Sequence, residues 1–343
     1  MTRNKAYVIA EMSANHNGDF HRAVDIVRAM KDSGADAVKL QTYTADTLTI
    51  DCDRPDFIIG QGTVWEGQRL HDLYASASTP WEWHAELFAL AAELGMDCFS
   101  TPFDNTAVDF LEQFGPPFYK VASFELVDLG LIEYIASKGR PVIMSTGMGS
   151  LEEISDAVDV VKRAGVELTL LKCTSAYPSP PNSMNLKTMA DMAKRFDVEI
   201  GLSDHTLGTT VPVAAVALGA TVIEKHFTLS RKDEGPDSTF SLEPDEFREM
   251  VDAVRIVEQA LGDVQYQRSE KEQASVVFRR SLYAVKDIAQ GEAITHENVR
   301  SIRPGYGLKP KFLKALIGKK AAQAMERGTP ISADTIKDFE IEE

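Results

Sequence analysis

Short apolar segments alternate with amphipathic segments along the first three quarters of the chain. The apolar segments are near-continuous, as expected of strands buried on both faces, and a helical pattern follows each one. Eight such segments occur, at residues 7–13, 37–42, 97–102, 118–123, 141–146, 167–175, 198–205 and 222–228. Eight strand–helix units with right-handed crossovers predict an α/β fold of the (β/α)8 TIM barrel type. A doubly wound open sheet is the alternative, because periodicity alone does not show closure.

One connection interrupts this alternation. Residues 43–80 are too many for a simple loop between a strand and a helix, and they follow the carboxyl end of a predicted strand. Barrel enzymes build substrate contacts at that end, so we interpret this stretch as an active-site insertion. Trp65, Trp81 and Trp83 are expected to pack the insertion, with a platform for a sugar as the alternative.

The last part of the chain contains a faint internal repeat. DIAQGEAITHENV and AMERGTPISADTI match at identical spacing, with Ile288 aligned to Met325 and Gly291 to Gly328. Two copies of one unit predict a small pseudo-symmetric domain. We therefore expect a barrel over residues 1–264, a polar linker over 265–275 and a C-terminal domain over 276–343.

Composition and charge narrow the class of protein. The 343 residues include 36 Lys and Arg against 52 Asp and Glu, a net charge of −16 that argues against a nucleic-acid partner. The chain has neither the roughly 18 consecutive apolar residues of a membrane span nor a signal peptide, so we expect a cytoplasmic protein with no membrane partner. Three distant cysteines support neither a disulfide framework nor a zinc site.

Polar side chains end nearly every predicted strand, where a barrel that served only packing would have Val, Ile or Leu. Lys39, Lys120 and Lys172, with neighbouring hydroxyls, suit an anionic and phosphorylated small molecule. The alternative for each lysine is a buried ion pair. The other strand-end residues of this group are Glu11, Gln41, Thr101, Ser123, Ser145, Ser175 and Ser203.

Two histidines end consecutive predicted strands. His205 in GLSDHT and His226 in VIEKHF would converge at one edge of the barrel, which fits a divalent metal with open positions for water or substrate. For a single histidine, a hydrogen-bonded place in the core would be the better interpretation. The pair at adjacent strand ends favours metal ligation.

The motifs, taken in order, resemble a known family over nearly the whole chain. They are AEMSANHNGD, KLQTYTADTL, STPFD, YKVAS, STGM, LKCTSAYP, GLSDHT and EKHF, followed by RSLYAVKDI and RPGYGLKP, and they resemble the bacterial sialic acid synthases. This resemblance implies a (β/α)8 barrel with a C-terminal antifreeze-like (SAF) domain. It also implies a transferase that condenses phosphoenolpyruvate with an acetamido sugar, uses a divalent metal such as Mn²⁺, Mg²⁺ or Co²⁺, and forms a domain-swapped homodimer.

The resemblance also implies roles for individual residues. Phosphoenolpyruvate would be held by Lys39, Thr101, Lys120, Ser123, Ser145, Ser175 and Ser203. His205 and His226 would bind the metal, with Glu11 beside it to manage protons. The sugar would contact Gln41, Tyr177 and Asp237, and Arg303 of the dimer partner would reach the same sugar.

Within the family, the chain is most similar to the branch whose acceptor is 2,4-diacetamido-2,4,6-trideoxy-L-altrose, in AEMSANHNG, KLQTYTADTLT, the DFIIGQG insertion with LYASASTPWEWH, and DSTFSLEPDEF. Ser175 and Ser238 replace the Asn and His usual in synthases that use N-acetylmannosamine. A sialic or legionaminic acid synthase is the nearest alternative function. More distant ones are an aldolase that forms a Schiff base through a lysine, and a non-catalytic binding protein with an antifreeze-like tail.

Overall fold

The computed structural model describes residues 5–341, which form two compact units. The first ends at Gly262 and the second begins at Asp263. The polar stretch expected as a linker contains a short helix, α11 (Glu270–Ser275), whose N-terminus is capped by the Ser269 side chain. The exact domain limits given by the sequence stay a prediction.

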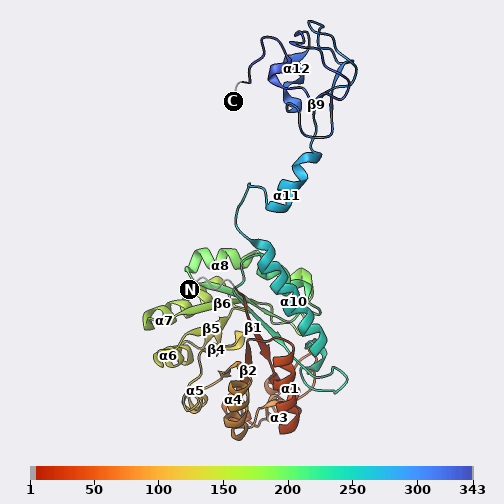
Figure 1. Cartoon of the computed structure of the whole chain (residues 1–343). Helices are drawn as coiled ribbons and strands as arrows, with labels where there is room; N and C mark the ends of the chain where they lie inside the picture. The colour runs from red at the N-terminus through yellow and green to blue at the C-terminus, as the bar shows by residue number, and fades with distance from the viewer. Residues whose placement is uncertain (1–4, 342–343) are drawn as a thin grey trace. The chain divides into compact units, whose positions relative to one another are not determined.

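Eight parallel strands form the core of the first unit, surrounded by helices (Figure 1). Their hydrogen-bonded order is β3-β2-β1-β8-β7-β6-β5-β4, and β4 lies against β3 to complete the circle. The predicted (β/α)8 barrel is therefore confirmed. The strands are β1 (Tyr7–Glu11), β2 (Ala37–Thr42), β3 (Asp97–Pro102), β4 (Tyr119–Val121), β5 (Val142–Ser145), β6 (Leu168–Cys173), β7 (Glu199–Asp204) and β8 (Val222–His226).

One long helix follows each strand, directly or after a loop. The last of them begins with Pro244 in its first turn, where the missing N–H is not needed, and it buries Phe247, Met250 and Val254 against the barrel. Leu261, at the end of this helix, is exposed although its spacing from Val254 and Val257 would place it on the buried face. The helices are α1 (Phe20–Asp32), α4 (His84–Glu93), α5 (Asn105–Glu112), α6 (Leu129–Ser137), α7 (Leu151–Ala164), α8 (Thr188–Phe196), α9 (Thr210–Ala217) and α10 (Pro244–Leu261).

The interior of the barrel is closed by a layer of apolar side chains. Alternate residues of a strand point to the same face, so each strand sends one side chain into this layer and the residue two positions later into the layer above it. On β7 the residue is Gly201, where an added Cβ would lie 2.6 Å from Leu171 Cδ2. The other members are Ile9, Ala37, Phe99, Phe118, Ile143, Leu171 and Val222.

The insertion after β2 contains two helices, α2 (Ala45–Leu48) and α3 (Leu70–Ala77). On α3, Leu70, Leu73, Tyr74 and Ala77 occur at the spacing of a single helix face. The opposite side carries exposed charges that are joined by the Arg69 guanidinium, which binds Asp51 at 2.9 Å and both Asp53 and Asp72 at 2.7 Å. The helix is therefore amphipathic, with its charged side in solvent.

The second unit contains the antiparallel pair β9 (Ser281–Ala284) and β10 (Val299–Ile302), and the short helix α12 (Leu313–Leu316). The repeat noted in the sequence has a structural counterpart. Ile288 and Met325, which are equivalent in the repeat, exchange backbone hydrogen bonds of 2.8 and 2.9 Å, and both are buried. This reciprocal pairing is what a pseudo-two-fold relation between the halves requires.

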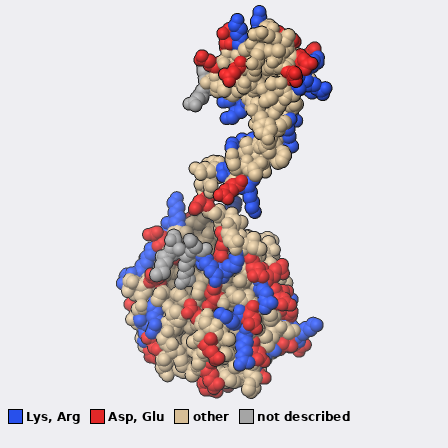
Figure 2. Space-filling model, viewed as in Figure 1, with Lys and Arg blue, Asp and Glu red and all other residues tan. Residues whose placement is uncertain are grey.

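Two surface observations bear on partners. Over the visible face of the molecule, basic and acidic side chains are interspersed (Figure 2). This is not the clustered basic stripe that tracks a nucleic-acid backbone. Among residues 5–341, no helix combines the length and the apolar character that crossing a membrane requires.

Candidate active site

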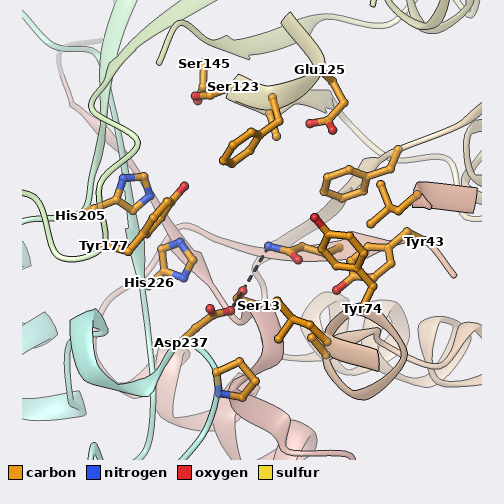
Figure 3. A pocket seen from close by; sticks show the side chains of 18 of the residues that line it. Ser13, Tyr43, Tyr74, Ser123, Glu125, Ser145, Tyr177, His205, His226 and Asp237 are labelled. Carbon is orange, nitrogen blue, oxygen red and sulfur yellow. Dashed lines mark hydrogen bonds between the residues drawn. The ribbon is translucent and has the colours of Figure 1, made fainter. Parts of the chain in front are cut away.

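A ring of polar residues lies directly above the apolar layer, at the carboxyl ends of the strands. Each member stands two positions after a member of the apolar layer, so strand alternation places both on the interior face. The ring borders a cavity of about 360 Å³ (Figure 3). Its members are Glu11, Lys39, Thr101, Lys120, Ser145, Cys173, Ser203 and Glu224.

Two carboxylates surround Lys39 within this ring. The Lys39 ammonium forms ion pairs with Glu11 and, at 3.4 Å, with Glu224 Oε1, and it donates to Thr101 Oγ1 at 3.3 Å. Burial opposes the charged form of Lys39, yet the two carboxylates raise its pKa above the ordinary value. Burial raises the pKa of Glu11, which makes this carboxyl a better proton acceptor than an exposed glutamate.

Lys120 is the second buried lysine of the ring, and its charge acts on Glu224. Its ammonium donates to Ser145 Oγ at 2.7 Å and to the Val121 carbonyl at 2.8 Å, and burial lowers its pKa. Burial alone would raise the pKa of Glu224, but Lys120 and Lys39 lower it, so this carboxylate is held charged. Both lysines thus lower the pKa of one buried carboxylate, and Lys120 keeps one N–H donor beyond its two present contacts, whereas Lys39 uses all three of its own.

Gly147 brings two predicted serines together. A Cβ at this position would lie 2.2 Å from Ser175 Oγ and 2.7 Å from Ser123 Oγ, so only glycine fits here. The Gly147 N–H donates to Ser123 Oγ at 3.1 Å. The loop after β5 therefore holds a cluster of hydroxyl and amide donors beside Lys120, as an anion-binding site needs.

The two histidines lie side by side, with ring centroids 5.3 Å apart. His205 Nδ1 lies 3.1 Å from the Thr174 carbonyl, which favours the tautomer that leaves Nε2 as an electron-pair donor. His226 Nδ1 is buried without a hydrogen-bond partner, and burial lowers the pKa of this imidazole well below its usual value, so it stays neutral. Burial opposes the charged form of His205, but Cys173 raises its pKa, so a metal bound at both histidines would have to displace a proton from His205. Among the described residues, no group of three or more His, Cys, Asp or Glu side chains is arranged around one metal position.

Aromatic rings enclose the histidines. The Tyr177 ring centroid lies 4.4 Å from that of His205, and the rings of Phe240 and Trp65 pack against Tyr177. Trp65 also donates its indole N–H to the Pro236 carbonyl at 3.0 Å, so the insertion reaches the loop after β8. Trp65 lines the cavity, whereas Trp81 and Trp83 are not among its lining residues.

A polar chain connects β2 with the loop after β8. Gln41 donates to Ser13 Oγ at 3.2 Å, as the dashed line in Figure 3 shows, and Ser13 Oγ bonds in turn to the Asp237 carboxylate. Asp237 also accepts from the Ala14 N–H at 3.3 Å. Burial raises the pKa of Asp237.

The structure brings most of the predicted residues to this one cavity. Lining it directly are Lys39, Gln41, Lys120, Ser123, Ser145, Tyr177, Ser203, His205, His226 and Asp237. Glu11 and Thr101 contact Lys39, and Ser175 lies beside Gly147, so these three stand next to the lining. Arg303 belongs to the second unit, where it is exposed. The roles assigned to these residues stay predictions.

The expectation for Lys172 was wrong. Leu171 and Cys173 point into the barrel, so alternation turns the intervening Lys172 outward, and its ammonium bonds to the Cys173 carbonyl at 2.7 Å. Attention to strand parity in LLKC would have separated it from Lys39 and Lys120. Lys172 does not line the cavity.

Sequence reasoning missed several residues that line the cavity, among them two tyrosines and a glutamate. Tyr43 and Tyr74 belong to the insertion, and Glu125 lies in the short 3-10 helix after β4 (Figure 3). Glu125 Oε2 is buried without a hydrogen-bond partner, and burial raises the pKa of this carboxyl to about 7. No sequence pattern predicts that Glu125 faces the cavity, because it lies in a short 3-10 helix after β4, where neither strand nor α-helix periodicity applies.

Comparison with known proteins identifies relatives along the whole chain. Residues 26–266 match the NeuB family, and residues 279–337 match the SAF domain. A pseudaminic acid synthase of Campylobacter jejuni (strain 81-176) is 49% identical over 95% of both chains. One of Helicobacter pylori is 46% identical over 96% of this chain and 97% of its own. The crystal structure of a Leptospira borgpetersenii N-acetylneuraminic acid synthetase in complex with citrate, 29% identical, covers 79% of this chain and 90% of that one with a TM-score of 0.71.

Proposed function

Because this chain belongs to the NeuB family and carries a SAF domain, we propose that it catalyses the pseudaminic acid synthase reaction. In that reaction phosphoenolpyruvate and 2,4-diacetamido-2,4,6-trideoxy-L-altrose combine with water to give pseudaminic acid and phosphate. The observation that carries the proposal is the pair Lys39 and Lys120, fully buried at the base of one cavity with hydroxyl donors around them.

The donor set matches a phosphorylated carboxylic acid. Lys120 and Ser145 already form a bonded pair, and Ser203 Oγ donates to Glu224 Oε1 at 3.2 Å. Lys120 uses two of its three N–H donors, and Ser145 accepts from it, so both keep a donor for a bound anion, whereas the single O–H of Ser203 would have to leave Glu224 to reach that anion. The residues assigned to phosphoenolpyruvate are Lys39, Thr101, Lys120, Ser123, Ser145, Ser175 and Ser203.

His205 and His226 would hold a divalent cation such as Mn²⁺, Mg²⁺ or Co²⁺, with water or substrate completing its coordination. A cation there acts as a Lewis acid on a carbonyl oxygen of the acceptor. The rest of the chemistry falls to the side chains. Lys39 and Lys120 stabilise negative charge on phosphoenolpyruvate while its C3 forms a bond with the aldehyde carbon of the open-chain sugar.

Water then adds at C2, and the bond between C2 and the phosphate oxygen breaks to release phosphate. Glu11, whose pKa burial raises, would take the proton from that water and become neutral, while Lys39 would keep its pairing with Glu224. Gln41, Tyr177 and Asp237 would orient the sugar at the histidine side of the cavity. Arg303 would reach it from the SAF domain of a second copy in a homodimer, as the resemblance implies.

The test is phosphate release from phosphoenolpyruvate with this altrose derivative, with its legionaminic acid counterpart and with N-acetylmannosamine. Each is measured with and without EDTA, beside His226→Ala and the exposed control His21→Ala. We expect metal-dependent release with the altrose derivative and a loss of at least a hundredfold in His226→Ala alone. Release with only another acceptor, or release insensitive to EDTA and to His226→Ala, would contradict the proposal, and a single-chain mass in gel filtration would contradict the role of Arg303.

A further inference from the structure

The apolar face of α3 is directed at the cavity and not at a protein core. Leu70, Leu73, Tyr74 and Ala77, which we call the α3 stripe, all line the cavity, although the charged side of the helix faces solvent. An amphipathic helix normally buries its apolar face against another element. Here Leu73 and Ala77 are already buried, and a substrate in the cavity would cover the half-buried Leu70 and Tyr74 as well.

The rest of this side of the cavity continues the same character. Leu48 and Ile59 of the insertion add aliphatic carbon, and Phe103 follows β3. The insertion contributes no charged side chain to the lining, in contrast to the lysines and carboxylates on the strands. The polar groups near the stripe are the two tyrosine hydroxyls, Thr63 and Glu125.

The stripe lies at the end of the cavity opposite to the histidines. Figure 3 shows Tyr43 and Tyr74 facing His205 and His226 across the open space. On the proposed function, the aldehyde of the open-chain sugar must lie near the histidines and the phosphoenolpyruvate donors. Its C6 end, the farthest carbon from the aldehyde, then extends toward the α3 stripe.

We propose that the α3 stripe binds the C6 methyl group of the acceptor, so that the enzyme selects 6-deoxy sugars over their 6-hydroxy counterparts. This inference rests on the proposed function. A methyl group gains by leaving water for aliphatic surroundings, whereas a hydroxymethyl group at Leu70 and Leu73 loses hydrogen bonds that those side chains cannot replace. Apolar pockets reject an added hydroxyl by about a hundredfold at most, so a preference of roughly ten- to a hundredfold is expected.

The experiment compares kcat/KM for 2,4-diacetamido-2,4,6-trideoxy-L-altrose and for the same sugar bearing a hydroxyl at C6. The variants are Leu73→Asn, a polar replacement of similar size, and Leu73→Met, which keeps the stripe apolar. Ala75→Asn, on the exposed side of α3, introduces the same polar group away from the cavity. The ratio of the two kcat/KM values within one preparation does not depend on the fraction of folded enzyme.

We expect the wild type, Leu73→Met and Ala75→Asn to keep the preference, and Leu73→Asn to reduce it about tenfold. Leu70→Asn, at a half-buried position of the same stripe, should give the same direction if Leu73→Asn folds poorly. Equal kcat/KM for both sugars in the wild type, or equal ratios in Leu73→Asn and Ala75→Asn, would overturn the inference and leave the proposed function standing. If neither sugar gave phosphate release, both the inference on the α3 stripe and the proposed function would be contradicted.

Discussion

The polar ring on the strands and the α3 stripe border the same cavity but differ in chemical character and in the elements that carry them. Ring residues such as Lys39, Lys120 and Glu224 are buried ionisable side chains whose direction is fixed by strand alternation in the barrel. The stripe is aliphatic and aromatic, and the exposed side of its helix is joined to the rest of the insertion by surface ion pairs. The two proposals therefore assign reaction chemistry to the ring and acceptor choice to the stripe, and mutations should separate these roles.

The largest effect is expected from comparing two strand-end lysines, Lys120, which belongs to the ring, and Lys172, which points away from it. Lys120→Met removes an ammonium that bonds to Ser145 and faces the cavity, so kcat/KM for phosphoenolpyruvate should fall by roughly 10²–10³. Lys172→Met, on the outer face of β6, should stay within a few-fold of the wild type. Phosphate release measures both, with thermal unfolding as the check on folding. Similar losses in the two variants would mean that strand parity does not define the ring.

Glu125 lines the same cavity, and its ionisation is expected to have an intermediate effect. The effect is a dependence of the free energy of unfolding on pH. The Glu125 pKa of about 7 in the folded protein exceeds the ordinary 4.5, so the folded chain keeps a proton that the unfolded chain has released between these values. Stability therefore falls as pH rises through this window, by on the order of 2 kcal/mol. Glu125→Gln should abolish that part of the decline in urea unfolding at pH 5 and pH 8. Parallel declines in variant and wild type would show that Glu125 titrates normally.

The smallest effect is expected from the exposed side of the insertion. Arg69→Ala removes the ion pairs with Asp51, Asp53 and Asp72, and exposed pairs contribute little individually. The KM for the acceptor should rise two- to fivefold, with the KM for phosphoenolpyruvate unchanged, because only the stripe loses its support. Arg28→Ala, an exposed change on α1, is the matched control. A shift in the KM for phosphoenolpyruvate alone would contradict the separation of the two regions.

Sequence reasoning succeeded where local periodicity determines position. The eight strands follow from near-continuous apolar runs, and residues two positions beyond the apolar layer, such as Lys39 and Ser203, necessarily share the interior face. The same rule shows why the expectation for Lys172 failed, since the polar character of a strand end does not give its parity.

The remaining site residues could not be found in this way. Tyr43, Tyr74 and Glu125 lie in the insertion or in an irregular turn, whose path depends on contacts distant in sequence, such as Trp65 with Pro236. The sequence of α3 does show the amphipathic spacing of the stripe residues. The pattern alone does not tell a helix packed on a core from one that faces an open cavity.

Trp65 can serve as an intrinsic fluorescence probe of the cavity. Its indole lies at the cavity wall, hydrogen-bonded to Pro236 and packed on Tyr177, while the other two tryptophans are not among the lining residues. A ligand that enters the cavity changes the polarity around this one indole, so its fluorescence emission should report occupancy without any label. Sugar binding could then be followed in variants such as Lys120→Met that no longer turn over, which separates recognition of the acceptor from its conversion.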